Sequence, residues 1–460
     1  MPVLYMEKSS VESLTEQDIR DIIEENTIGM KYGKLNDYYI GQHSILGETK
    51  KDSTAPNNKL VNNMAKYITD TAIGYFVGKP VIYNSDNDVF LQEIQDIFDY
   101  NDEQDHNMEL AKQCSICGNC FEMLYIDEDC KIRFAKVKAG DLVMIYETET
   151  GFTTPLAAIR TIHSRDKNNN LIRKVEFWNA YQTLYFRSVN GGYLNLESIT
   201  EHYWHDVPFV EYINNEERIG DFEGVISEID AYNKVQSNTA NYFQYNDDAI
   251  LKVTKLGDVT SQDIADMKEK GAIILEDGGD VAWLLKTIDD TGLENYKNRL
   301  EKNIHLGANV PNMADEAFGN NLSGVAVSYK LWGLEQICAI KERKFKRGLQ
   351  RRIELITNIL NVMGRKYDYR DIIPNFRRNK PQNILEIAQI ITMLANDLSR
   401  ESRLQMLPTV ENVRDEIDKL EEEKNKDMKD FGSYDNFAKI FQTTEAEAET
   451  PEESKAGADE

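Results

Sequence analysis

Apolar positions recur every three or four residues through the first 120 residues of the chain. That spacing puts them on one face of an α-helix, so a mainly helical region is predicted here. Thr15 is a favourable N-cap for the first helix, and Gly78 with Pro80 ends the longest one. The predicted helices are the segment after Thr15 and residues 58–77, 89–100 and 108–116.

Between residues 121 and 203 the period changes to two. Short apolar runs such as FEMLYI, KIRFAKV and KVEFWNA are separated by clusters of turn residues. The turns are expected at residues 127–129, 166–170 and 190–192. This pattern predicts an antiparallel meander set on the helical base.

Beyond residue 208 the helical period returns, over residues 222–247 and again over residues 291–306. Between these two stretches we expect a strand at 250–253, a helix at 261–270 and a hairpin that turns at Gly278 and Gly279. Two helices that flank a small α/β insert predict a stalk that carries a compact knob.

Residues 307–324 are rich in Gly and Asn and have almost no periodicity, which indicates a loop. Residues 325–363 then read as one continuous helix, far longer than the usual length of about ten to fifteen residues. A helix of that length must be braced by neighbouring elements or subunits. A strand near residues 367–373 and helices over 383–396 and 410–426 are expected to follow.

Residues 443–460 carry seven acids against one lysine and almost no large apolar residue, so this end is expected to be disordered. The whole pattern predicts an α+β protein. A chain of 460 residues exceeds what one core usually supports, so two or three structural units are expected.

Charge changes this picture, because 79 Asp and Glu against 53 Lys and Arg give a formal net charge of -26. Such a surface repels phosphate, which argues against gripping DNA by counterion release but does not exclude letting DNA pass. The sequence has neither a membrane-spanning apolar run nor the layout of a signal peptide. A soluble protein, cytoplasmic when made, is therefore expected, and its five cysteines fit a reducing compartment.

Three cysteines, Cys114, Cys117 and Cys120, with Cys130 nearby, form the most suggestive chemical motif. Three thiolates at this spacing begin some zinc and iron-sulfur sites, but the gap to the fourth is unlike those patterns. We interpret the cluster as buried packing and keep a metal-binding enzyme as the alternative. His202 and His205 are read as exposed loop residues, and no nucleotide-binding or hydrolase motif occurs, so neither catalysis nor a cofactor is expected.

One strongly basic stretch stands out in this acidic chain, near the middle of the predicted long helix. Its cations are Lys341, Arg343, Lys344, Lys346, Arg347, Arg351 and Arg352. They could contact DNA phosphate or form ion pairs between subunits, and the common alternative for such a run is a solvated face.

Several sequence segments, together with the order of the predicted helices and strands, resemble the portal proteins of siphophages. These segments are residues 58–80, 207–221, 229–233 and 310–334. The last is the most specific, since it joins the loop to the long helix. The resemblance covers about residues 15–425, and the cysteine cluster falls where the family mostly carries small or apolar residues.

The resemblance implies a division of the chain into named parts. These are a wing over residues 1–221, stem helices over 222–249 and 291–307 with a clip at 250–290 between them, a tunnel loop at 308–324, the long helix with a return strand at 325–382, a crown at 383–428 and an acidic tail at 429–460. The tunnel loop would bring Asn309, Asn312, Asp315, Glu316, Asn320 and Asn321 to a DNA channel. The clip would dock the terminase through Asp263, Asp266, Lys268 and Glu269.

The resemblance further implies a closed, dodecameric ring at the portal vertex of the virion capsid, which passes double-stranded DNA without sequence preference. Its implied partners are the terminase large subunit, scaffold and major capsid proteins and a head-completion adaptor, with no membrane. Three classes stay open from the residues alone: a DNA conduit, a cysteine-held metal enzyme and an oligomeric scaffold without DNA.

Overall fold

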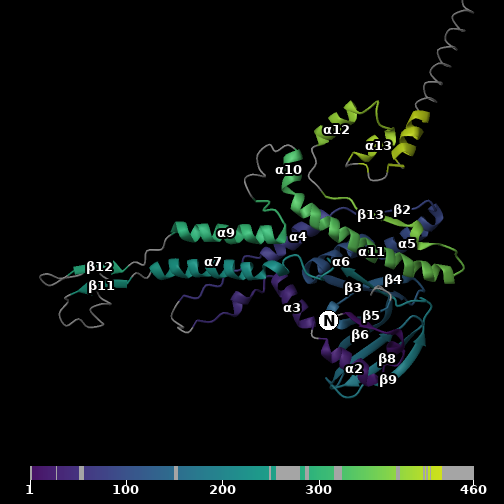
Figure 1. Ribbon diagram of the computed structural model, residues 1–460, viewed down its shortest axis with the longest axis horizontal. Coiled ribbons are helices and arrows are strands. Elements are labelled where there is room, and N and C mark those ends of the chain that lie inside the picture. The colour runs from purple at the N-terminus through teal and green to yellow at the C-terminus, as the bar shows by residue number, and fades with distance from the viewer. Residues whose placement is uncertain are drawn as a thin grey trace, which may run out of the picture. The chain divides into compact units, whose positions relative to one another are not determined.

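The computed structural model describes residues 3–26, 28–50, 56–149, 154–247, 250–254, 280–284, 290–314, 324–379, 384–407, 410, 413–414 and 416–426. The chain forms two compact units, Met1–Asn379 and Lys380–Glu460. The fold is α+β, as the sequence predicts (Figure 1). Among the described residues, no helix is long and apolar enough to cross a bilayer.

The first unit begins with one short strand and a series of helices. They are β1 (Val3–Met6), α1 (Lys8–Glu12), α2 (Glu16–Glu25), α3 (Ile28–Tyr39), α4 (Met64–Phe76), α5 (Asp88–Tyr100) and α6 (Glu103–Cys117). Thr15 caps α2 in a capping box with Asp18, which confirms the predicted cap. The helix predicted over residues 58–77 begins later, because Asn63 accepts a hydrogen bond from the Lys66 N–H and so caps α4.

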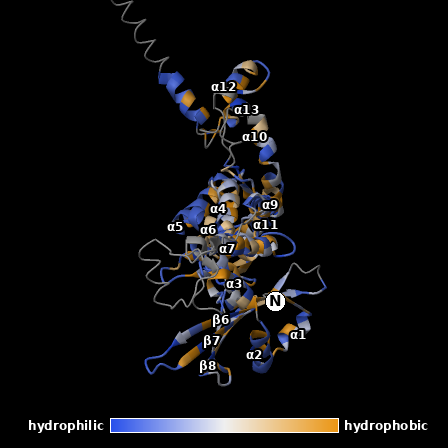
Figure 2. Cartoon of the chain, turned by 90° about the vertical axis from the view of Figure 1, so that its left-hand side faces the viewer, coloured by the Kyte–Doolittle hydropathy of each residue, from blue (hydrophilic) through white to orange (hydrophobic). Residues whose placement is uncertain are grey.

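The strands after α6 form two sheets, so the prediction of one meander was wrong. β5 (Leu142–Glu147), β6 (Pro155–Arg165), β7 (Leu171–Trp178), β8 (Gln182–Val189) and β9 (Asn195–Glu201) join β1 in a six-stranded sheet, in which β1 pairs parallel to β5. The turns predicted at 127–129, 166–170 and 190–192 separate successive strands. Figure 2 shows α2 beside β6, β7 and β8, where Ile19, Phe177 and Phe186 belong to one small core.

A second sheet has the order β10-β3-β4, from β3 (Asn119–Ile126), β4 (Ile132–Val137) and β10 (Phe209–Ile213). β10 comes from a distant part of the chain and pairs antiparallel with β3, so that Tyr212 lies opposite Cys120. The short helical turn Ala139–Asp141 follows β4, and the chain then enters the six-stranded sheet at β5. A period of two identifies strands, but it carries no information on which strand joins which sheet.

Two helices extend from the body of this unit and lie side by side (Figure 1). α7 (Ile226–Asp247) leads to β11 (Ile250–Thr254), and β12 (Asp280–Leu284) leads back into α9 (Asp290–Ala308). β11 and β12 pair antiparallel. These elements confirm the predicted pair of stalk helices and the strand at 250–253; the predicted helix at 261–270 lies outside the described residues.

The long helix is interrupted once. α10 (Gly324–Lys330) and α11 (Trp332–Val362) meet at Leu331, so the single helix predicted over 325–363 is two helices in sequence. α11 then crosses β10, where a Cβ built on Gly348 would lie 2.4 Å from the Tyr212 ring. Only glycine allows this close approach of helix and sheet.

Beyond α11 the chain forms the turn Tyr369–Asp371 and the short strand β13 (Ile373–Asn375), which pairs with β2 (Ile82–Asn84). The predicted strand at 367–373 is thus shorter and starts later. The second unit contains α12 (Ile384–Met393), α13 (Arg400–Gln405) and helical residues 413–414 and 416–426. The sequence predicted the first and the last of these but not α13.

Candidate functional site

Arg352, on the face of α11 that turns inward, is fully buried and lies between two acidic side chains. Its Nε donates to Glu122 Oε2 at 3.0 Å, and its Nη2 lies 2.8 Å from Glu122 Oε1. Its Nη1 donates to Glu103 Oε1 at 3.1 Å and to Asn107 Oδ1 at 2.9 Å. The guanidinium carbon stands 4.6 Å from the centre of the Phe134 ring. One cation therefore joins α11 to α6 and β3 in the core.

The two carboxyl groups around Arg352 have pKa values shifted in opposite directions. Burial opposes the charge on Glu122, but Arg352 and His106 favour it, and the pKa of Glu122 falls to about 2. The Tyr212 hydroxyl also donates to this carboxylate, at 2.9 Å. Burial dominates at Glu103 and raises the pKa of that carboxyl. The surroundings of Arg352 thus favour the charged form of Glu122 and disfavour the charged form of Glu103.

Three more cations of the basic stretch are paired within the chain. Lys341 is buried against Asp221, and Lys344 reaches Glu216. Arg351 Nη1 lies 2.7 Å from Asp206 Oδ2. Together with Arg352, these side chains have partners inside the subunit, where the sequence suggested DNA, other subunits or solvent. Exposed Arg343 and Arg347 and half-buried Lys346 make up the rest of the stretch.

The sequence did contain a signal for this burial. Lys341, Phe345, Leu349 and Arg352 stand three or four residues apart, so the two cations share a helix face with two core residues.

Residues 56–63 form an extended strap along α7, although the sequence predicted helix from residue 58 onward. The Asn58 N–H donates to Asn241 Oδ1 at 2.6 Å, and the Asn62 N–H donates to Asn233 Oδ1 at 2.7 Å. Between them the Leu60 N–H donates to Ser237 Oγ at 2.9 Å. Every second residue of the strap thus bonds to every fourth residue of the helix.

The two repeats match because of elementary geometry. Four residues of α-helix rise about 6 Å, and two residues of extended chain cover about 6.6 Å. Asn233 and Ser237 are buried, and the Asn233 side chain also contacts His43 Nδ1 at 2.8 Å. We call these three bonds the polar ladder; they fix the register of the stalk helix against the body.

Part of the segment assigned to the channel is described. Asn309 has a φ of 52°, in the left-handed region, directly after α9. Asn312 donates to Glu301 Oε1 at 2.8 Å, and the Tyr67 hydroxyl donates to the Pro311 carbonyl at 2.9 Å. The first half of this segment is therefore held against α9 and α4. Asp315, Glu316, Asn320 and Asn321 lie outside the described residues, as do Asp263, Asp266, Lys268 and Glu269 of the predicted clip.

The clustered cysteines are free thiols, and only two of them contact each other. Cys114 and Cys120 have their sulfur atoms 3.2 Å apart in the core. Cys117 accepts from Gln113 Nε2, and burial raises the pKa of its thiol to about 12. Cys130 is exposed in the turn between β3 and β4. A protonated, buried thiol is a poor metal ligand. The described residues hold no group of three or more side chains that could bind a metal.

Of the two histidines noted in the sequence, His202 is half-buried rather than exposed, with Nε2 3.0 Å from the Asn179 carbonyl, and burial lowers its pKa.

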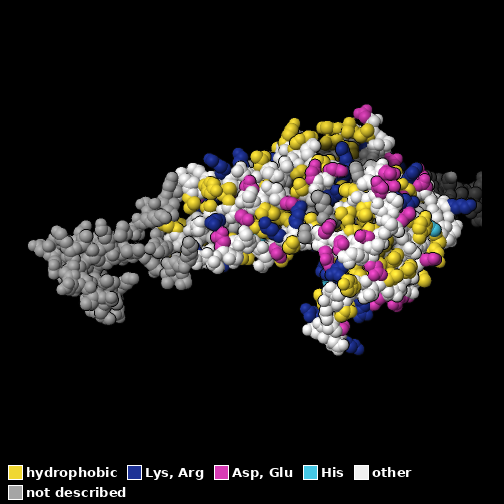
Figure 3. Space-filling view, turned by 60° about the horizontal axis from the view of Figure 1, so that its bottom comes forward, with side chains coloured by type: hydrophobic (Ala, Val, Ile, Leu, Met, Phe, Trp, Pro, Cys, Tyr) yellow, Lys and Arg dark blue, Asp and Glu magenta, His cyan; other side chains and the backbone are white. Residues whose placement is uncertain are grey.

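On the face shown in Figure 3, acidic and basic side chains are mixed with apolar ones along the stalk.

The geometry is that of an α+β body from which a two-helix stalk extends, with the polar ladder along α7 and buried ion pairs inside the body. The chain belongs to the family of phage portal proteins, since residues 22–430 match the family described as phage portal protein, SPP1 Gp6-like. It is similar to the portal protein of Bacillus phage SPP1, at 23% identity over 402 residues, which cover 83% of this chain and 79% of that protein. It is also similar to the portal protein of Clostridium phage phiCD119, at 26% identity over 433 residues, which cover 87% of this chain and 94% of that protein.

Proposed function

We propose that the chain is the subunit of a closed ring at one vertex of the phage capsid, through which double-stranded DNA is packaged and later ejected. The observation that carries the proposal is the stalk: α7 and α9 extend from the body, and most residues of α9 are exposed. Head-to-tail contacts that close into a ring would supply the missing partner surface. Family membership supports the role in DNA packaging.

The parts of the chain then take the following roles. Residues 1–221 form the wing, α7 and α9 the stem, residues 250–290 the clip, residues 308–324 the tunnel loop, residues 325–382 the long helix with its return strand, and residues 383–428 the crown, before the acidic tail at 429–460. The ring is dodecameric in the capsid and works without catalysis of its own.

DNA contact is assigned to the tunnel loop. Asn309, Asn320 and Asn321 would offer hydrogen bonds to phosphate without a fixed charge, and Asp315 and Glu316 would oppose tight binding. Asn312 would have to give up its bond to Glu301 to contact DNA. A net charge of -26 favours a slippery channel, because translocation needs a low barrier at every step. Arg343, Lys346 and Arg347 are the cations of the basic stretch left for DNA or for a neighbouring subunit.

The clip is proposed to dock the terminase large subunit through Asp263, Asp266, Lys268 and Glu269. The remaining partners are the scaffold and major capsid proteins, which would meet the ring in the capsid, and a head-completion adaptor after packaging. Assembly would begin in the host cytoplasm and end at the portal vertex of the virion.

Solution mass and electron microscopy of the purified full chain test the ring. We expect particles near twelve times the chain mass of 52.9 kDa, with a central channel wide enough for duplex DNA. A stable monomer at micromolar concentration would contradict the proposal. Closed particles with no such channel would favour the oligomeric scaffold instead.

A further inference from the structure

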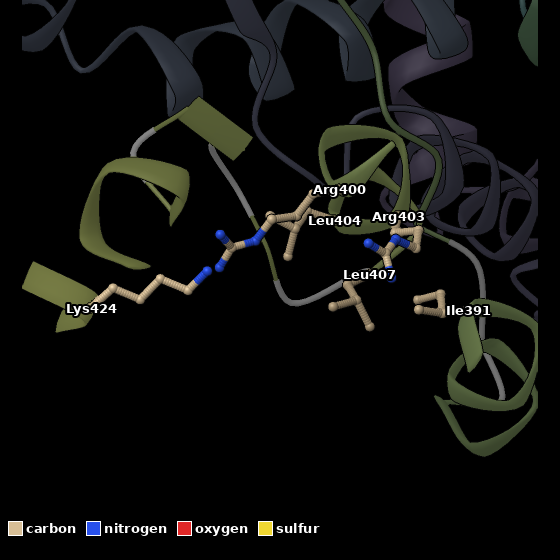
Figure 4. A pocket seen from close by; sticks show the side chains of 6 residues that line it. All are labelled: Ile391, Arg400, Arg403, Leu404, Leu407 and Lys424. Carbon is tan, nitrogen blue, oxygen red and sulfur yellow. The ribbon is translucent and has the colours of Figure 1, made fainter. Parts of the chain in front are cut away.

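The second unit contains an open cleft between its helices (Figure 4). Apolar side chains of Ile391, Leu404 and Leu407 line it, together with the cations Arg400, Arg403 and Lys424. Each of the three leucine and isoleucine side chains is only half-buried. The cleft therefore combines an apolar floor with a positively charged rim.

The cations of this rim have no acidic partner among the described residues. Figure 4 shows the Arg400 guanidinium and the Lys424 ammonium pointing toward one another. Like charges that converge repel, unless an anion lies between them. Nε of Arg403 is shielded from solvent and lacks an acceptor within the described part of the chain. A buried donor without a partner is costly, so an acidic group placed at this rim would be stabilised there.

The sequence that follows this unit has the complementary pattern. Phe437, Ile440 and Phe441 stand at the spacing that puts three apolar side chains on one helical face. An acidic run comes directly after them. Its members are Glu445, Glu447, Glu449, Glu452 and Glu453.

We propose that the C-terminal segment 437–453 binds this cleft, with its apolar triad on Ile391, Leu404 and Leu407 and its acids on the cationic rim. Ten residues lie between Lys426 and Phe437, which makes eleven Cα–Cα steps. They span up to about 36–40 Å when extended, enough to return to a cleft that Lys424 itself lines. A tether of this kind gives a local concentration in the millimolar range, so a weak contact suffices.

Nucleic acid is the competing ligand for three cations. The apolar floor favours the peptide segment, because phosphate gains nothing from isoleucine and leucine side chains. The inference concerns the second unit alone and does not depend on ring formation.

A labelled peptide of residues 433–453 tests the contact directly. Its binding to the chain truncated after residue 430 is measured by fluorescence anisotropy, beside a control peptide with Phe437→Ser, Ile440→Ser and Phe441→Ser. We expect the native peptide to bind at least about tenfold more tightly than the control. Binding should weaken as NaCl rises, and Arg400→Glu with Arg403→Glu in the truncated chain should weaken it further.

Hydrogen exchange in the otherwise intact chain gives the second measurement. Amides of residues 388–407 should exchange more slowly in the full chain than in the truncated one, and the three serine substitutions should remove that protection. Equal binding of the two peptides, or exchange that truncation leaves unchanged, overturns the proposal. The proposal is also overturned if the binding of duplex DNA requires Arg400 and Arg403 and the binding of the native peptide does not. Mass measurement of the same samples reports ring formation separately.

Discussion

Arg352 and Lys341 illustrate how much one helix pattern says about single side chains. Both share a face of α11 with Phe345 and Leu349, so the sequence alone implied that they turn inward. It did not identify their partners, because each acidic side chain lies more than a hundred residues away along the chain. A run of seven cations therefore resembled a DNA contact, although Lys341 and Arg352 within it pair with buried acids.

Replacing Arg352→Leu should lower the free energy of unfolding by about 3–5 kcal/mol, because Glu122 would stay buried without its cation. The matched control is Arg343→Leu on the exposed face of the same helix, expected to change it by no more than about 0.5 kcal/mol. Chemical denaturation of both variants at neutral pH is the measurement. Equal stability of the two would show that the buried pair contributes nothing that leucine cannot replace.

The loss of stability at acidic pH should depend on Glu122. Its folded pKa of about 2 lies below the ordinary 4.5. The stabilisation is therefore present above pH 4.5 and is lost as pH falls toward 2. Glu122→Gln should destabilise the chain at pH 7 and flatten this part of the profile, measured by thermal unfolding from pH 2 to 7.

Glu103→Gln is the control, because ionisation of Glu103 should affect the free energy of unfolding in the opposite direction to ionisation of Glu122. Its pKa is raised in the folded protein, so its ionisation opposes folding as pH rises. The variant should lose less stability at pH 7 than Glu122→Gln. The reverse order would mean that Glu103, and not Glu122, carries the charge that balances Arg352.

At the scale of elements, periodicity located most helices and strands and failed where a distant partner decides the conformation. Leu60 and Val61 fit a helical pattern, yet residues 56–63 are extended, since their N–H groups bond to α7 rather than to preceding carbonyls. The partners are more than 170 residues away, with Ser237 as one of them. No local pattern contains that information, and the same holds for β10, which joins β3 from far along the chain.

The polar ladder makes a specific prediction for α7. Asn233→Ala should cost about 1 kcal/mol, because the Asn62 N–H loses its acceptor. Asn238→Ala, at an exposed position of the same helix, should cost much less. Hydrogen exchange is the sharper measurement: the amides of Asn58, Leu60 and Asn62 should exchange faster in Asn233→Ala and Ser237→Ala than in the control. Unchanged exchange would mean that water replaces the lost bonds without loosening the strap.

For the whole molecule, the succession of the described helices and strands was largely predictable, because periodicity and turn residues are local features of the sequence. The division of the strands into two sheets was not, and neither was the break at Leu331. Of the candidate site, the strap and the buried ion pairs required the folded chain, whereas the described start of the tunnel-loop segment lies after α9 as expected.

Charge in the tunnel loop should control DNA passage more than ring assembly. Replacing Asp315→Lys and Glu316→Lys should leave the ring intact and slow packaging, because each subunit would add two cations that DNA must release at every step. An in vitro packaging assay at two salt concentrations is the measurement, with Asp96→Lys and Asp99→Lys on exposed α5 positions as the control of equal charge. Packaging at the normal rate in low salt would remove the loop from the mechanism.

The polar ladder also has a mechanical meaning. Its three bonds cross between two segments that run side by side, at matched intervals along the strap and along α7. A pull along the stalk loads all three together in shear, so none breaks until all are strained. A sideways pull on the strap instead loads them one after another, as in a zipper. The stalk should therefore be stiff toward the axial load of a passing polymer, while the strap can be peeled away by a small lateral force.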